Sequence, residues 1–336
     1  MVQKQANNPV SDLMESSAFS GTAQMAGDEN WSLAKGFANR VDERPIAVDS
    51  RFGMASGSKI FTAIAVLQLV EQGKLELSAS LSALLPKTFP NFHATVHQLL
   101  CHTSGLPDYF DEEAQDDFEQ LWQDIPMYRM QTPADFVPLF RDLPPVEEPG
   151  ARFRYNNAGY IALGLVIEQV TGEEFADYVE REVLVKAGMS ESGYFRLDRL
   201  PKNTAYGYID EGDSWRTNQY AIPIRGGADG GAFVTAGDMA KFWNRLMDGT
   251  LLTEETTNQL LAVQAQQGEA AYGYGVWIDQ QEEGIVKYHI MGYDPGVNIH
   301  SGYYPKHKSI VTVLSNAAEG AYDIVKVIER EKKLRG

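Results

Sequence analysis

Ser56 and Lys59 have the residue types and the spacing of a nucleophile and its base. They lie three residues apart in the run Ser56-Gly-Ser-Lys59, which opens a long apolar segment. Residues three apart on a helix share a face, so the lysine nitrogen would lie one turn from the serine hydroxyl. A lysine withdrawn from water can accept the serine proton, and the free N–H groups of a helix N-terminus would stabilise an oxyanion. The alternative interpretation is a serine that only caps the helix.

A second run of the same form, Ser32-Leu-Ala-Lys35, lies in a segment predicted to be a strand. Side chains three apart on a strand point to opposite faces. This serine and this lysine therefore cannot cooperate, and we interpret the run as structural.

The run Tyr155-Asn156-Asn157 follows a turn and precedes an apolar segment predicted to be a helix. A tyrosine can act as a general base if nearby cations lower its pKa, and Lys59 could do so. Asn157 could hydrogen-bond a substrate carbonyl or hold the lysine. The alternative is a capping asparagine beside a packed tyrosine.

Together these runs resemble the serine β-lactamase and penicillin-binding protein superfamily, nearest to class C β-lactamases, D,D-peptidases and esterases of that fold. Similar segments follow in the same order over about residues 18–316: a His-Thr-Ser-Gly-Leu turn at 102–106, a Gly-Gly and Thr-Ala-x-Asp helix start at 230–238, and closing strands at 272–298. The resemblance implies an α+β fold with a mainly antiparallel sheet, flanking helices and an inserted, mostly helical domain.

The resemblance also implies roles for particular residues. Ser56 would be the nucleophile, and Lys59 would share the base role with Tyr155, which would later activate the hydrolytic water. Asn157 would orient Lys59 and the substrate. The backbone N–H groups of Ser56 and Tyr293 would form the oxyanion hole.

The third motif of the family departs from its pattern here. The family places a basic residue two positions before a glycine on the strand that lines the site. If Gly292 is that glycine, Ile290 occupies the basic position and His289 stands one residue too early. Strand alternation would separate His289 from Gly292 unless a bulge intervenes, and both are kept as substrate-binding candidates. Loss of this handle for a substrate carboxylate favours an ester or a neutral amide, unless Arg225 supplies a cation.

Hydrophobic patterning indicates how these residues are positioned. It predicts a hairpin over residues 20–38, a buried helix over 56–72, mainly helices over 76–200, and antiparallel strands followed by an amphipathic helix towards the C-terminus. Strands at both ends with helices between them predict two domains. The sheet-containing domain would comprise 1–75 plus 206–336, the helical domain 76–205, with the active site between them.

Composition narrows the function further. The chain has 336 residues, and its formal net charge of -17 argues against nucleic-acid binding. No signal-peptide pattern or membrane-spanning run occurs, which predicts a cytoplasmic protein unless a leader has been trimmed. One cysteine excludes an intrachain disulfide. The expected chemistry needs a small-molecule substrate and no cofactor, and a monomer is the default expectation.

Four other residues could suggest chemistry but favour simpler interpretations. His93 and His97 have the spacing of a metal pair on a helix, but no third ligand is evident, so no metal site is predicted. His102 is interpreted as pinning a turn through hydrogen bonds, and Cys101 as a small buried hydrophobe.

Three hypotheses follow. The first is a serine hydrolase that forms an acyl-enzyme with a small ester, amide or β-lactam. The second is a penicillin-binding D,D-peptidase or β-lactamase proper. The third is a catalytically idle member of the fold that binds a ligand or a protein, which the intact set of Ser56, Lys59 and Tyr155 opposes.

Overall fold

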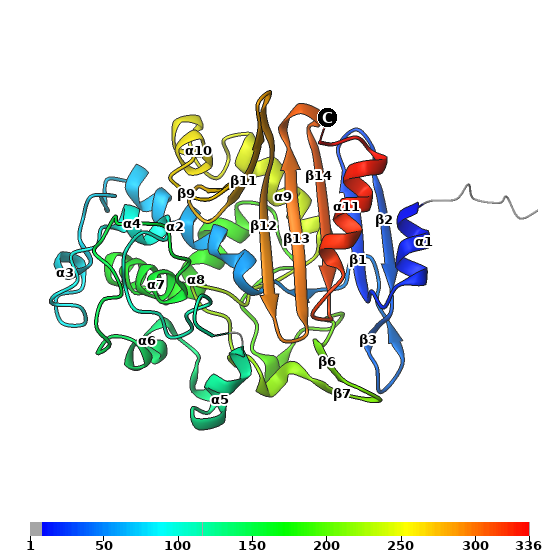
Figure 1. The fold of residues 1–336 in the computed structure, drawn as a ribbon, viewed down its shortest axis with the longest axis horizontal. Coiled ribbons are helices and arrows are strands. Elements are labelled where there is room, and N and C mark those ends of the chain that lie inside the picture. The colour runs from blue at the N-terminus through cyan, green and yellow to red at the C-terminus, as the bar shows by residue number, and fades with distance from the viewer. Residues whose placement is uncertain (1–8, 116, 336) are drawn as a thin grey trace, which may run out of the picture.

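A large antiparallel sheet forms the centre of the molecule in the computed structural model, which describes residues 9–115 and 117–335. Its strand order is β2-β1-β14-β13-β12-β11-β10-β9, and each neighbouring pair is antiparallel (Figure 1). The strands are β1 (Gly21–Ala26), β2 (Trp31–Lys35), β9 (Ala265–Gln267), β10 (Ala270–Tyr272), β11 (Trp277–Gln281), β12 (Gly284–Asp294), β13 (Val297–Tyr304) and β14 (Ser309–Ser315). The predicted N-terminal hairpin and the late antiparallel strands are confirmed.

Within the described part of the chain, three two-stranded ladders accompany the sheet. They pair β3 (Phe37–Asn39) with β4 (Arg44–Pro45), β5 (Phe52–Gly53) with β8 (Phe233–Val234), and β6 (Tyr208–Glu211) with β7 (Ser214–Thr217). The pair β5–β8 matters for the site, because it joins the chain just before Ser56 to the chain just after a glycine-rich loop at 226–231.

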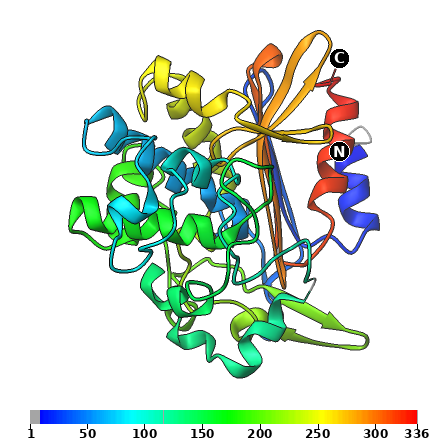
Figure 2. The same ribbon diagram turned by 60° about the vertical axis from the view of Figure 1, so that its left-hand side comes forward.

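Helices cover both faces of the large sheet (Figure 2). On one face α1 (Pro9–Ser16) and α11 (Ala321–Glu331) enclose a separate hydrophobic cluster. On the other face lie α2 (Lys59–Glu71), α9 (Ala236–Met247) and α10 (Glu254–Leu261), within the main hydrophobic core. Helix α2 is apolar nearly all round, and its residues from Lys59 to Leu69 are buried. A helix of that composition must be enclosed on all sides.

The segment from 76 to 205 is built from helices and turns, and the described residues there form no named strand. Its α-helices are α3 (Leu81–Leu84), α4 (Val96–Leu100), α5 (Leu121–Asp124), α6 (Pro133–Phe136), α7 (Asn157–Thr171) and α8 (Phe175–Val179). Short 3₁₀ or π turns occur both in this segment and elsewhere in the chain. Those in the segment are η2 (Phe118–Gln120), η3 (Met127–Arg129), η4 (Val137–Leu139), η5 (Glu180–Val185) and η6 (Leu197–Arg199), and those outside it are η1 (Ala55–Ser58), η7 (Asn218–Tyr220) and η8 (Pro305–His307). The division into two domains stays a prediction.

The second Ser-x-x-Lys run lies in β2, as predicted. Its lysine donates hydrogen bonds to the backbone oxygens of Glu15, in the last turn of α1, and of Ser17, just after α1, at 3.1 and 2.8 Å. Lys35 therefore ties α1 to the sheet.

Candidate active site

Ser56 lies in the tight turn η1, immediately before α2. Neighbouring loops hold this turn: Ala55 O accepts hydrogen bonds from Gly231 N at 3.0 Å and from Ser58 Oγ at 2.8 Å, and Met54 N donates to Ala232 O at 2.8 Å. Ala55 adopts a positive φ of 45°, a strained conformation for alanine. The predicted helix over 56–72 is confirmed as a 3₁₀ turn that continues into α2.

Lys59 is 1% exposed, and its Nζ contacts three oxygen atoms. Nζ lies 2.9 Å from Ser56 Oγ, 2.8 Å from Asn157 Oδ1 and 2.6 Å from Asp229 O. The amide and carbonyl oxygens can only accept, so they hold two N–H bonds of the lysine. The third contact, with Ser56 Oγ, places the lysine nitrogen within proton-transfer distance of the serine hydroxyl.

Tyr155 lies against the same serine. Its phenol hydrogen-bonds Ser56, and its ring lies 4.9 Å from Lys59 Nζ and stacks on Trp277 at 6.3 Å. Burial, followed by the negative charge of Glu112, raises the pKa of Tyr155 well above its usual value, although the bond to Ser56 lowers it. The lowering expected from Lys59 is therefore wrong, because burial and nearby carboxylates outweigh it. The raised pKa favours the neutral phenol, which can donate a proton.

Asn156 and Asn157 have different roles at the start of α7. Asn156 is the N-cap, and its side chain accepts from Gly159 N at 2.6 Å. Asn157 holds Lys59 as predicted, while its Nδ2 faces Phe110 O and Glu112 Oε1, both at 3.3 Å. The capping alternative thus applies to Asn156 and not to Asn157.

Gly292 brings β12 against the nucleophile turn. A Cβ at this position would lie 2.2 Å from Met54 O and 3.1 Å from Gly57 N, so only glycine fits. Tyr293 follows directly, and both residues line the same cavity as Ser56. The oxyanion-hole role of the Ser56 and Tyr293 N–H groups stays a prediction.

The strand geometry corrects the expectation for His289. The register of β12 with β13 runs without a break from Tyr288 to Asp294, so no bulge intervenes and the side chains alternate. Ile290 packs in the main core, on the face that Gly292 turns towards η1. His289 points to the opposite face and hydrogen-bonds Asp279 at 3.1 Å. It does not line the cavity, and the basic position of the third motif is apolar.

Arg225 does not replace the missing cation. Its Nε donates to Tyr194 O at 3.1 Å, and its guanidinium lies 3.7 Å from Glu174 and 3.8 Å from Asp177. The residues that line the cavity do not include it.

Three histidines outside the cavity have structural partners. His102 accepts from Asn156 N at 3.1 Å and contacts Tyr272 OH at 3.1 Å, so it pins its turn as predicted. His93 contacts Ser82, and His97 contacts Tyr274 OH at 2.7 Å. Within residues 9–115 and 117–335, no group of His, Cys, Asp and Glu could hold a metal ion.

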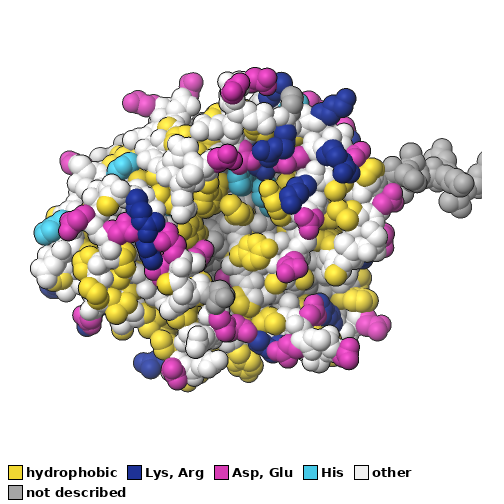
Figure 3. Space-filling view, in the orientation of Figure 1, with side chains coloured by type: hydrophobic (Ala, Val, Ile, Leu, Met, Phe, Trp, Pro, Cys, Tyr) yellow, Lys and Arg dark blue, Asp and Glu magenta, His cyan; other side chains and the backbone are white. Residues whose placement is uncertain are grey.

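The cavity beside Ser56 has a volume of about 760 Å³. Figure 3 shows this face of the molecule hollowed between the helical part and the sheet, with hydrophobic side chains gathered in the hollow and acidic ones at its borders. Aromatic rings from both parts of the chain line it, among them Phe110, Phe118, Phe136 and Trp277. A small organic substrate would fit here with its carbonyl carbon at Ser56.

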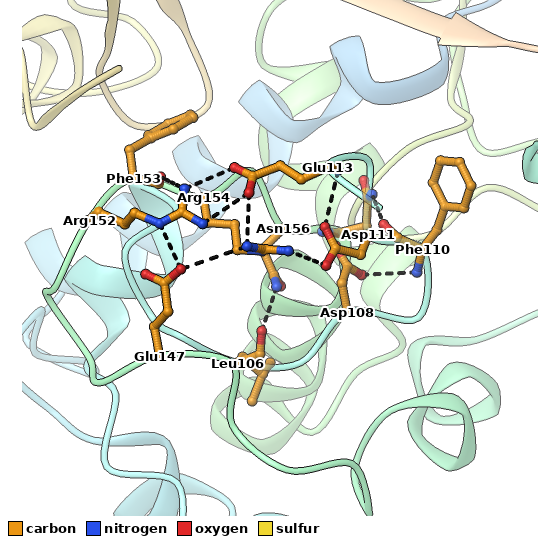
Figure 4. Close-up of polar contacts among 11 residues, drawn as sticks. Leu106, Asp108, Phe110, Asp111, Glu113, Glu147, Arg152, Phe153, Arg154 and Asn156 are labelled. Atoms are coloured by element: carbon orange, nitrogen blue, oxygen red, sulfur yellow. Dashed lines mark hydrogen bonds and ion pairs between the residues drawn. The ribbon is translucent and has the colours of Figure 1, made fainter. Parts of the chain in front are cut away.

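An ion-pair network fixes the loop that carries Glu112 (Figure 4). Arg152 pairs with Glu113 at 2.9 Å and Glu147 at 2.7 Å, and Arg154 pairs with Glu113 at 2.8 Å and with Asp111. The arginines belong to the segment that ends at Tyr155, so the network joins the acidic loop to the tyrosine.

Sequence reasoning missed Asp108, whose carboxylate anchors the start of α7. It accepts from Ala158 N at 2.9 Å and from Asn157 N, while burial raises its pKa to about 7. Its position six residues after His102 offered no recognisable pattern.

A buried helix that starts at a serine–lysine pair, a tyrosine against that serine, and a covering antiparallel sheet define a serine hydrolase that acts through an acyl-enzyme. The family described as Beta-lactamase matches residues 7–331, and the chain belongs to this family. The family, the α+β fold and the enzyme class expected from the sequence are confirmed.

Two solved structures and one curated protein are similar over nearly the whole chain. A penicillin-binding protein from Bacillus halodurans is 52% identical with a TM-score of 0.92, covering 96% of this chain and 99% of that one. An octameric penicillin-binding protein homologue from Pyrococcus abyssi is 26% identical with a TM-score of 0.84, covering 97% and 76%. Penicillin-binding protein 4* of Bacillus subtilis (strain 168) is 29% identical over 327 residues, which are 91% of this chain and 70% of that protein.

Across the described residues, no helix is both long and apolar enough to cross a membrane.

Proposed function

We propose that Ser56 is the nucleophile of a hydrolase that cleaves small esters and neutral amides. The observation that carries this proposal is the contact of Ser56 Oγ with Lys59 Nζ at 2.9 Å, within a cavity that also holds Tyr155. Ser56 Oγ attacks the substrate carbonyl carbon while its proton passes to Lys59 Nζ. The carbonyl oxygen becomes an oxyanion facing the N–H groups of Ser56 and Tyr293.

Collapse of this intermediate breaks the bond to the leaving alcohol or amine. The neutral phenol of Tyr155 donates a proton to that leaving group, and the Lys59 ammonium returns a proton to Tyr155. A water molecule then attacks the acyl-enzyme, giving its proton through Tyr155 and Lys59, and the acid leaves as Ser56 recovers its hydrogen.

The substrate class follows from the charge of the cavity wall. The described lining residues include no lysine, arginine or histidine, and Ile290 fills the basic position of the third motif. A substrate carboxylate would have no cationic partner there, so neutral acyl groups are favoured.

A second candidate function is covalent penicillin binding, favoured by the 52% identical structure that is described as a penicillin-binding protein. Incubation of the wild type and of Ser56→Ala with a penicillin and with an activated ester, followed by intact-protein mass spectrometry, separates the candidates. Ester turnover that requires Ser56, with no penicillin adduct and no penicillin loss, supports the proposal. A lasting penicilloyl adduct on the wild type alone supports the second candidate. Turnover by Ser56→Ala equal to the wild type overturns both.

We propose the division into a sheet-containing part, 1–75 plus 206–336, and a helical part, 76–205, because lining residues of the cavity come from both. A monomer in the cytoplasm stays the prediction from the sequence. Analytical ultracentrifugation tests the oligomeric state, for which the octameric homologue from Pyrococcus abyssi provides the contrasting outcome.

A further inference from the structure

The wall of the catalytic cavity carries charge of one sign. Its charged lining residues, as far as the structure describes the chain, are all acidic: Glu112, Glu113, Asp117, Glu119, Asp229 and Asp294. Two of them are neutralised in the wall, because Glu113 pairs with Arg152 and Arg154, and Glu119 pairs with Arg216 at 2.6 Å.

Among the described residues, no arginine or lysine side chain forms an ion pair with the cavity carboxyl groups of Asp229, Glu112 and Asp294. Asp229 accepts a hydrogen bond from Tyr109 OH, and Glu112 accepts one from Asn157 Nδ2 at 3.3 Å. Asp294 differs from both, because no residue within 9–115 and 117–335 donates a hydrogen bond to its carboxyl group.

Asp294 is positioned by the same strand that forms the rim of the site. It stands two residues after Gly292 in the unbroken register of β12, paired with Val297, so the two share a strand face. That face meets the nucleophile turn at Gly292. Where the third motif of the family has a basic residue, two positions before the glycine, this chain has Ile290. Two positions after the glycine it has the acidic residue Asp294. This strand face therefore carries an acidic group in this chain, whereas the family's third motif gives it a basic one.

The environment of Asp294 opposes its charge in the empty cavity. Burial, then the charges of Asp229 and Glu112, raise the pKa of Asp294 to about 8, against a lowering contribution from Lys59. An ammonium group would supply both the opposite charge and the N–H donors that this carboxyl group lacks. The aromatic rings around the cavity would also tolerate a cation over their faces.

We infer that the preferred substrate is an ester or amide that carries an ammonium group, and that Asp294 binds this group while Ser56 attacks the carbonyl. The inference rests on the proposed function and narrows its substrate class. Asp294 is then the residue that selects an aminoacyl substrate over a neutral one.

The test compares p-nitroanilides of ω-amino acids, from two to six carbons, each with the alkanoyl anilide that has CH₃ in place of NH₃⁺. For at least one chain length we expect the wild type to prefer the ammonium member by about tenfold to hundredfold in kcat/KM, as a charge-assisted hydrogen bond allows. Asp294→Asn should lose this preference, because kcat/KM falls more for the ammonium member than for the methyl member. Asp117→Asn, which removes one charge from the same wall, should keep most of the preference.

A preference for the methyl member at every length, or an unchanged preference in Asp294→Asn, would overturn the inference. Boronic acids with ammonium or methyl ends, measured by calorimetry, separate this failure from failure of the proposed function. Equal Ser56-dependent binding of both kinds overturns the ammonium site alone. No binding of either kind together with no hydrolysis of any anilide overturns the proposed function, and the inference with it.

Discussion

Charged side chains are paired on one face of β12 and unpaired on the other. On the face towards α11, Lys287 Nζ lies 2.7 Å from Glu329, and Tyr304 OH donates to the same carboxylate at 2.7 Å. Asp279 there contacts His289 at 3.1 Å and Arg335 at 2.9 Å. On the face towards Ser56, Asp294 has no hydrogen-bond donor within the described chain. The paired face holds the C-terminal helix on the sheet, whereas the unpaired carboxyl group of Asp294 lines the cavity beside Ser56.

On the face of β12 towards Ser56, the largest expected loss of activity comes from replacing Tyr155. We expect Tyr155→Phe to lower kcat/KM for an anilide by about 10²- to 10⁴-fold, because the neutral phenol is the proton donor for the leaving amine. A p-nitrophenyl ester should lose much less, since nitrophenolate leaves without a proton. Steady-state kinetics on both substrates measures the difference. Equal losses on anilide and ester would contradict the role of proton donor.

On the opposite face, the largest expected loss of stability comes from disrupting the buried ion pair of Lys287 and Glu329. Lys287→Met leaves the carboxylate of Glu329 buried, and we expect the free energy of unfolding to fall by about 3–5 kcal/mol. The double variant Lys287→Met/Glu329→Gln should recover part of this loss, because it buries no unpaired charge. Urea unfolding measures both, and kcat/KM of the folded single variant should stay near that of the wild type. A loss below about 1 kcal/mol would show that the pair is not a structural requirement.

The close contact between β12 and η1 at Gly292 can be tested by adding a single methyl group. Gly292→Ala places a Cβ 2.2 Å from Met54 O, so the strand and the nucleophile turn must separate. A displacement of about 1 Å at reacting groups can lower kcat about 10²-fold, and we expect a loss of that order in steady-state kinetics. Met291→Ala, one residue away and 39% exposed, is the matched control and should keep kcat within about threefold. Comparable losses in both variants would contradict a specific role for Gly292.

The last prediction is a pH dependence of stability at Asp294. The pKa of this group is about 8 in the folded chain, against an ordinary value of 3.8. Its contribution to stability is therefore fully present below about pH 4 and is lost as the pH rises through about 8, because the folded state holds a proton that the unfolded state releases. Asp294→Asn should flatten this decline in urea unfolding between pH 5 and 9. The charges facing Asp294 are those of Asp229, Glu112 and Lys59. Identical slopes in the wild type and Asp294→Asn would contradict the raised pKa.

Much of the fold could be predicted because its signals are local. The N-terminal hairpin, the buried helix after Ser56 and the late antiparallel strands follow from side-chain periodicity. The same periodicity showed that Ser32 and Lys35 cannot cooperate on a strand. It also indicated that His289 and Gly292 would separate, but only the continuous β12–β13 register excluded the bulge that would have joined them.

The sequence by itself determined that Ser56 and Lys59 share a helix face, because three-residue spacing acts within one turn. Only the tertiary structure brought Asn157 and Asp229 to Lys59, across separations of 98 and 170 residues. It also decided the raised pKa of Tyr155 and the isolation of Asp294. Both depend on burial and on charges contributed by distant segments, and side-chain spacing along the chain carries no information about either.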